Sequence, residues 1–171
     1  EENIGPPLAG FPAPIVLSRA RCAILRAMSD AILKAAVVGT GHLGRHHTRI
    51  LSRLPGIDFI GAYDADPDQL AAITSEYGVP ALPSAEAAGE ADAVVVATPT
   101  VNHRATAGML LEHGCNVMVE KPITTTLEEA AELIAQASDR NLVLAVGHVE
   151  FHNPAVQTAL GLAENVRYLE T

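Results

Sequence analysis

The stretch that decides the fold is Val37-Val38-Gly39-Thr40-Gly41-His42-Leu43-Gly44. An apolar, β-rich segment at residues 32–38 leads into the three glycines, and apolar residues three or four apart follow them in a helical pattern. A second apolar segment, Ile57–Tyr63, then ends on Asp64. The order strand, glycine turn, helix, strand and acid predicts the opening unit of a doubly wound parallel sheet, the Rossmann fold.

The glycine turn has the pattern G-x-G-x-x-G, in which each glycine has a separate structural role. The first permits a tight turn, the second lets a pyrophosphate approach the backbone, and the third lets the helix pack closely on the sheet. Unpaired N–H groups at the start of the helix would then bind the diphosphate of a dinucleotide. The predicted cofactor-binding residues of this turn are Gly39, Thr40, Gly41, His42, Leu43 and Gly44.

Asp64 stands twenty residues after Gly44, at the predicted carboxyl end of the second strand. A carboxylate there can accept hydrogen bonds from ribose hydroxyls, and it would repel a 2′-phosphate, so the sequence predicts NAD rather than NADP. Two other interpretations of the turn stay open on these residues alone. One is a structural glycine turn of an α/β fold, and the other is an adenosyl-methionine site, which uses a similar turn and acid.

Composition narrows the classes of function. The chain has 171 residues, of which 49% are hydrophobic and 4% aromatic, as in a globular α/β domain. A formal charge of −9 without a basic stripe argues against nucleic acid as a partner, and no apolar run reaches membrane-spanning length. Cys22 and Cys115 lack metal or redox spacing, which favours a reduced cytoplasm and a packing role for Cys115.

Alternating apolar runs and helical patterns predict about six strands in one NAD-binding domain at residues 31–150. The expected later strands lie near residues 79–82, 93–97, 116–119 and 142–146, and the expected helices lie near residues 84–88, 102–113 and 127–138. Residues 1–30, rich in Pro and Gly at the front, are expected to be a poorly ordered extension. Residues 151–171 are expected to hold a linker helix and the start of a second α/β domain that the chain lacks, so that the chain alone would bind NAD but turn over poorly.

Polar residues follow each predicted strand, where ligands of open α/β sheets bind. They include Thr98-Pro99-Thr100 with His103, then Glu120-Lys121-Pro122, then His148. A Lys directly after a buried strand can place its ammonium in the cleft. There it can hydrogen-bond a substrate oxygen and assist hydride transfer, so Lys121 is the predicted catalytic residue.

From Lys34 to about Pro154 the chain resembles the N-terminal domain of the glucose-fructose oxidoreductase, inositol dehydrogenase and rhizopine-catabolism (Gfo/Idh/MocA) family. The matching pieces are the glycine turn with His47, Tyr63-Asp64, Ala97-Thr98-Pro99-Thr100 with His103, and Glu120-Lys121-Pro122.

The resemblance implies that Lys121 lies by the nicotinamide and the substrate hydroxyl, and that the Lys121–Pro122 peptide is cis. It implies that Glu120 contacts the nicotinamide ribose. The remaining residues that it places along the cofactor are Thr98, Pro99, Thr100 and His103.

Within the family, residues 146–156 look most similar to the sugar-nucleotide branch, whose members oxidise UDP-N-acetylglucosamine or its uronic-acid relative with NAD. That branch usually has Arg-Phe where this chain has Phe151-His152, so the chain lacks an Arg that the branch carries at this point. Lys121, His148 and Asn153 are the predicted substrate-binding residues. The family also implies a homo-oligomer in the full-length protein.

The sequence therefore predicts the NAD-binding half of a sugar or nucleotide-sugar dehydrogenase. A non-catalytic NAD-binding or redox-sensing module is the alternative, and a methyltransferase is a third that Glu120-Lys121-Pro122 argues against. His42 and His46 have a spacing that can ligate zinc, but no carboxylate or Cys beside them completes a site, so no metal is expected.

Overall fold

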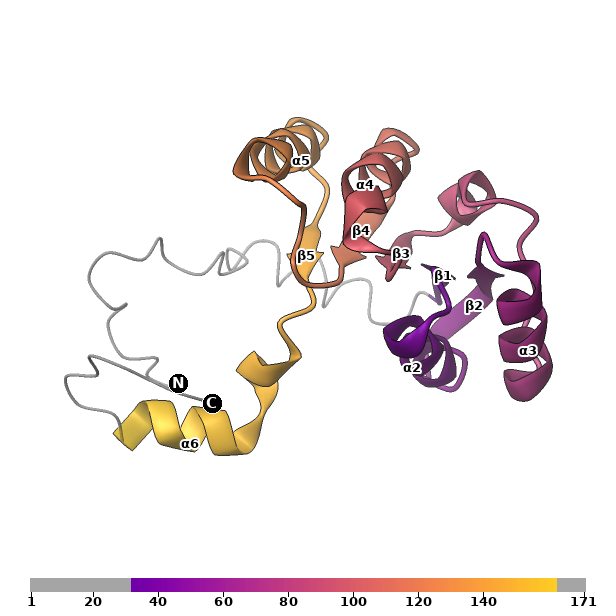
Figure 1. Cartoon of the computed structure of the whole chain (residues 1–171), viewed down its shortest axis with the longest axis horizontal. Coiled ribbons are helices and arrows are strands. Elements are labelled where there is room, and N and C mark those ends of the chain that lie inside the picture. Colours follow the sequence, from indigo (N-terminus) through magenta and orange to yellow (C-terminus); the bar gives the residue numbers. More distant parts are fainter. Residues whose placement is uncertain (1–31, 163–171) are drawn as a thin grey trace. The chain divides into compact units, whose positions relative to one another are not determined.

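The structure, a computed structural model, describes residues 32–162, with side chains to residue 159. The predictions for residues 1–30 and for residues 163–171 lie outside this described part. Its centre is a parallel sheet with the strand order β2-β1-β3-β4-β5 (Figure 1). The five strands are β1 (Leu33–Val38), β2 (Ile57–Tyr63), β3 (Ala93–Val96), β4 (Asn116–Val119) and β5 (Leu144–Val146).

Helices connect the strands and lie on both sides of the sheet. Figure 1 shows α4 and α5 on one side and α2 and α3 on the other. The helices are α2 (His42–Leu51), α3 (Pro67–Tyr77), α4 (His103–Glu112), α5 (Leu127–Asp139) and α6 (Pro154–Leu162), with 3-10 turns η1 (Glu86–Glu90), η2 (Thr100–Asn102) and η3 (Val149–His152). This arrangement confirms the predicted doubly wound α/β fold. Among the described helices, none combines the length and the hydropathy needed to cross a bilayer.

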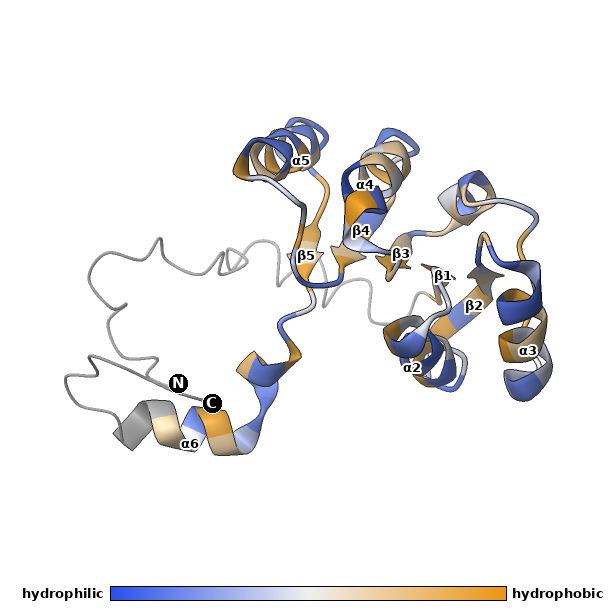
Figure 2. Cartoon of the chain, in the orientation of Figure 1, coloured by the Kyte–Doolittle hydropathy of each residue, from blue (hydrophilic) through white to orange (hydrophobic). Residues whose placement is uncertain are grey.

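The central strands are nearly continuous apolar runs because helices and neighbouring strands surround them. Val94 and Val96 of β3 are 1% and 0% exposed. Figure 2 shows β3, β4 and β5 in hydrophobic colours, whereas α2 to α5 carry hydrophilic faces. The sheet is therefore the inner layer of the domain, most fully covered at β1 and β3, whereas Ala145 of β5 is exposed.

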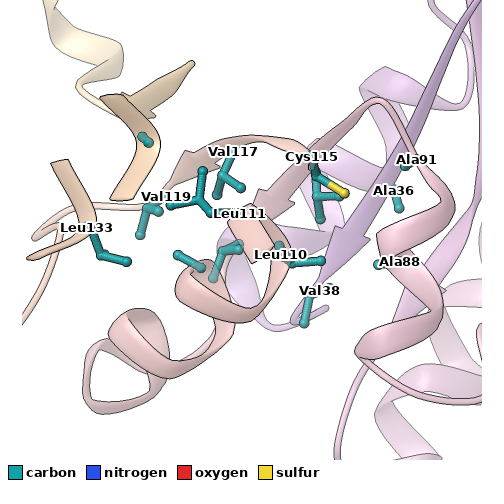
Figure 3. Close-up of a cluster of buried hydrophobic side chains, with 14 residues drawn as sticks. Ala36, Val38, Ala88, Ala91, Leu110, Leu111, Cys115, Val117, Val119 and Leu133 are labelled. Carbon is teal, nitrogen blue, oxygen red and sulfur yellow. The ribbon is translucent and has the colours of Figure 1, made fainter. Parts of the chain in front are cut away.

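The main core lies between the sheet and α4. Leu110 and Leu111 of α4 pack towards Val117 and Val119 of β4 (Figure 3). Cys115 is fully buried in the same cluster, and burial raises the pKa of its thiol. A packing role for this cysteine is thus confirmed, because a buried thiol that resists ionisation is a poor nucleophile.

The expected strand at residues 79–82 is wrong as a full strand, and within residues 32–162 the sheet has five strands where about six were expected. The segment contributes only an isolated bridge between Ala62 and Ala81. Pro80 and Pro83 flank this bridge and have no N–H to donate, so the ladder stops after two hydrogen bonds to β2. Likewise, the helix expected at residues 84–88 is the 3-10 turn η1, and β5 is shorter than the expected strand at residues 142–146.

Candidate functional site

A cleft of about 500 Å³ lies at the carboxyl ends of β1, β2 and β3. The strand order reverses between β1 and β3, which is where doubly wound folds bind their ligands. The predicted residues that line this cleft are Gly39, Gly41, Asp64, Thr98 and Pro99. The strand ends therefore bring together residues that lie up to sixty positions apart in the chain.

The three glycines of the turn occupy three different environments. Gly39 has φ +93°, and a Cβ there would lie 2.5 Å from the carbonyl carbon of Ala97. A Cβ on Gly44 would lie 1.8 Å from the carbonyl oxygen of Gly39, so α2 packs directly on the turn. Gly41 is different, because among the described residues no atom beyond Gly41 and its two chain neighbours lies within 4 Å of the place where its Cβ would be. The open side of the turn is thus at Gly41, as expected for the point where a diphosphate approaches the backbone.

Helix α2 begins at this open side. Gly41 is its N-cap and offers no side-chain hydrogen bond to the first turn. The first turn contains no acidic residue, and the predicted residues His42 and Leu43 are exposed there. Backbone N–H groups at such a helix start attract anions, so the turn fits a cofactor diphosphate.

Asp64 is joined to the glycine turn through Thr40. One carboxylate oxygen, Oδ2, accepts hydrogen bonds from the Thr40 N–H at 2.6 Å and from its hydroxyl at 3.0 Å. The other oxygen, Oδ1, accepts from the N–H of Asp66 at 3.0 Å. Thr40 is fully buried, so its side chain supports the turn from beneath and is shielded from a ligand in the cleft. Asp64 lines the cleft, and its Oδ1, which accepts one hydrogen bond, keeps acceptor capacity for a ribose hydroxyl.

His103 is placed differently from its neighbours in the predicted cofactor set. The residue is 1% exposed, and its ring nitrogens lie 2.9 Å from the carbonyl oxygen of Pro122 and 2.8 Å from that of Thr98. With both nitrogens facing protein carbonyls, the ring ties the loop after β3 to the loop after β4. In this structure the ring is a structural tie, and the direct contact of His103 with the cofactor stays a prediction.

The rest of the loop after β3 does face the ligand region. Pro99 is exposed and lines the cleft with Thr98, whereas Thr100 begins η2. The hydroxyl oxygen of Thr98 is buried without a hydrogen-bond partner among the described residues. An orphaned hydroxyl beside an open cleft is consistent with a site built for a polar ligand.

Glu120 and Lys121 follow β4 and have opposite exposure. Glu120 is 5% exposed, and its carboxylate contacts the His47 ring and the Lys121 N–H, while the Lys121 side chain is exposed. The Lys121–Pro122 peptide is cis, which confirms that expectation. An exposed ammonium at the end of a buried strand is free to meet a substrate, while the carboxylate before it is held by the protein.

The predicted substrate residues lie after β5, outside the residues that line the cleft. His148 is exposed ahead of η3. Asn153 opens α6: its Oδ1 accepts from the N–H of Ala155 at 2.9 Å, and its Nδ2 donates to Glu150 at 2.8 Å. The Asn153 side chain therefore already has local partners in the loop.

Sequence reasoning missed several residues that line the cleft, namely Asp66, Gln69, Asn102, Ala105 and Thr106. They lie in or next to the first turns of α3 and α4, and polar residues at those turns were the available signal. Gln69 also donates to the Thr40 carbonyl at 2.9 Å, which adds a second support beneath the glycine turn. Within residues 32–162, no group of three or more His, Cys, Asp or Glu side chains is placed to hold a metal ion.

Comparisons with known proteins agree with this geometry. Residues 33–148 match the model of an oxidoreductase family with an NAD-binding Rossmann fold. The chain is 37% identical over 126 residues to a UDP-N-acetylglucosamine 3-dehydrogenase of Acidithiobacillus ferrooxidans, covering 73% of this chain and 40% of that protein. It is 34% identical over 131 residues to inositol 2-dehydrogenase 1 of Saccharopolyspora erythraea, covering 72% and 39%.

A solved structure is similar too. GenD2 from gentamicin A biosynthesis, in complex with NAD, superimposes with a TM-score of 0.73 at 32% identity, covering 79% of this chain and 40% of that chain. The chain thus spans about two fifths of the length of the relatives it matches. The family match extends from β1 to the end of β5 and includes the glycine turn, Asp64 and the Glu120-Lys121-Pro122 turn. The chain belongs to the Gfo/Idh/MocA family of oxidoreductases, as its NAD-binding Rossmann domain.

Proposed function

We propose that this chain is the cofactor-binding part of a dehydrogenase that transfers hydride between a hydroxyl-bearing carbon of a sugar or nucleotide sugar and the nicotinamide of NAD. One observation carries the proposal. The glycine turn after β1 and the exposed Lys121 after β4 lie at the same edge of the sheet, on opposite sides of the point where the strand order reverses. A dinucleotide laid across that point would extend from the turn towards Lys121.

NAD, when bound, supplies the hydride acceptor, and the chain supplies orientation. The α2 start and Gly41 would hold the diphosphate, and Asp64 would hold the ribose on the β2 side. Lys121 would hydrogen-bond the substrate hydroxyl and assist as the hydroxyl oxygen loses its proton. The carbon that carries this hydroxyl would lose its hydrogen together with the electron pair. Thr98 and Pro99 would lie along the cofactor between these two ends.

The substrate class rests on the relatives rather than on the cleft. Two of them are named for UDP-N-acetylglucosamine and inositol, both of which carry ring hydroxyls. His148 and Asn153 are the proposed substrate contacts of this chain, although Asn153 must first release its local partners. A homo-oligomer and a cytoplasmic location stay predictions from the sequence.

Replacing Lys121 by Met tests the catalytic assignment. We expect K121M to slow NADH formation by about 10²–10⁴-fold, because a positioned proton-transfer group contributes about that much. Its affinity for NAD should stay within about twofold, since one exposed ammonium adds little to binding through the diphosphate. NADH absorbance, followed with a panel of nucleotide sugars and polyols, measures the rate.

The only other lysine of the chain makes a matched control. Lys34 is exposed in β1, at the opposite end of the strands, so K34M should leave the rate unchanged. Equal rates in K121M and the wild type would contradict the role of Lys121. Because the chain alone is expected to turn over poorly, a wild-type chain that binds NAD but reduces it with none of these substrates would show an NAD-binding module that is non-catalytic by itself.

A further inference from the structure

His47 and Glu120 form a partly buried pair that joins α2 to the end of β4. His47 Nε2 lies 2.7 Å from Glu120 Oε1, and the two side chains are 18% and 6% exposed. The second oxygen, Oε2, accepts from the Lys121 N–H at 3.2 Å. An ionised carboxylate can only accept hydrogen bonds, so His47 donates through Nε2.

A third element closes the space around this carboxylate. Gly147, buried directly after β5, would bring a Cβ to within 3.1 Å of the Glu120 carboxyl group. Glu120 is therefore enclosed by α2 through His47, by its own loop through the Lys121 N–H, and by the end of β5. The direction of its carboxylate is set by the protein before any ligand binds.

The position of the pair relative to the cofactor follows from the sheet, and it rests on the proposed function. If Asp64 after β2 holds the adenosine ribose, the other half of the dinucleotide must extend over the ends of β3 and β4. Glu120 lies at the end of β4. His47 lies in the same helix whose first turn faces the diphosphate.

We infer that His47 is a positioning residue for the nicotinamide half of the cofactor. Its hydrogen bond holds the Glu120 carboxylate in the direction needed at the end of β4, and through Glu120 it holds the backbone of the catalytic Lys121. The pair also joins the helix that anchors the diphosphate to the strand that carries the lysine. The affinity for adenosine diphosphate, which lacks the nicotinamide half, should not depend on the His47–Glu120 pair.

The test compares NADH with ADP by calorimetric titration of the whole chain. We expect His47→Leu to weaken NADH binding about tenfold, as for loss of one charge-assisted hydrogen bond, and to change ADP binding by less than about twofold. His47→Gln keeps a donor near the position of Nε2 and should restore most of the NADH affinity. His46→Leu makes the same change at an exposed neighbour in α2 and should leave the affinities for NADH and for ADP unchanged.

The affinities of H47L for NADH and for ADP together decide whether His47 is a positioning residue. If H47L weakens both ligands equally, or neither, His47 does not position the nicotinamide half and the inference is overturned. A wild-type chain that fails to bind NADH overturns the proposed function first, and the inference with it. Should H47L not fold, His47→Asn carries the same comparison, because its shorter amide cannot reach Glu120.

Discussion

The Gly44→Ala variant is expected to lose the native fold, whereas Gly41→Ala, three residues earlier, should fold normally and lose the cofactor. A Cβ on Gly44 would lie 1.8 Å from the Gly39 carbonyl oxygen, so α2 would have to move away from the turn. Backbone atoms cannot give way like the end of a flexible side chain, and we expect a cost of about 4 kcal/mol or more in the free energy of unfolding. That is a large fraction of the stability of a domain of this size.

Gly41→Ala makes the same chemical change in open space. The residue has φ −61°, which Ala adopts readily, and no described atom beyond its two chain neighbours lies within 4 Å of the new Cβ. The thermal midpoint should therefore stay near that of the wild type. The methyl group would instead occupy the approach of the diphosphate, and we expect NAD binding to weaken by about 100-fold or more, in line with overpacking costs of a few kcal/mol.

Thermal unfolding and NAD titration of the two variants form one experiment. We expect G44A to lower the thermal midpoint. We expect G41A to weaken NAD binding and to leave the thermal midpoint unchanged. A G44A chain as stable as the wild type would show that the close packing of α2 on the turn is not as described. A G41A chain that binds NAD normally would show that the diphosphate does not bind at the glycine turn.

Removing the carboxylate of Asp64 has the second largest expected effect on the affinity for NAD. We expect Asp64→Ala to weaken NAD binding about 10- to 100-fold, because charge-assisted hydrogen bonds to ribose hydroxyls are lost. Three protein contacts are lost as well, since Asp64 accepts from the N–H and the hydroxyl of Thr40 and from the N–H of Asp66. The ratio of the affinities for NAD and NADP should fall, because D64A removes the charge that repels a 2′-phosphate.

Thr40→Val separates the two roles of Asp64. It removes only the hydroxyl contact to Asp64 at 3.0 Å and keeps the N–H contact and the volume of the side chain. We expect a smaller loss of NAD affinity than in D64A and an unchanged preference for NAD over NADP. Measured affinities of both variants for both dinucleotides provide the check, and an unaltered NAD affinity in D64A would rule out the ribose assignment.

Local features of this chain were predictable because their reasons are local. The glycine turn, Asp64 and the cis peptide before Pro122 each depend on a short motif, and the structure places the first two in one cleft. The apolar run of β3 was readable for the same reason, since a strand buried on both faces has few alternatives.

Contacts between distant segments were not predictable. His47 and Glu120 are 73 positions apart, and nothing in either neighbourhood indicates the other. His103 looked like a ligand-facing residue, but its two carbonyl partners come from different loops and turn the ring inward. At residues 79–82 the apolar pattern of a strand was present, and the prolines around Ala81 prevented a longer ladder.

The central claim is that the turn at Gly39–Gly44 and Asp64 together form an NAD site. Calorimetric titration of the chain with NAD, NADP and adenosyl-methionine tests it most directly. We predict binding of NAD, at least about tenfold weaker binding of NADP because of charge repulsion at Asp64, and no heat from adenosyl-methionine. Heat from adenosyl-methionine without heat from NAD, or NADP binding as tight as that of NAD, would contradict the account.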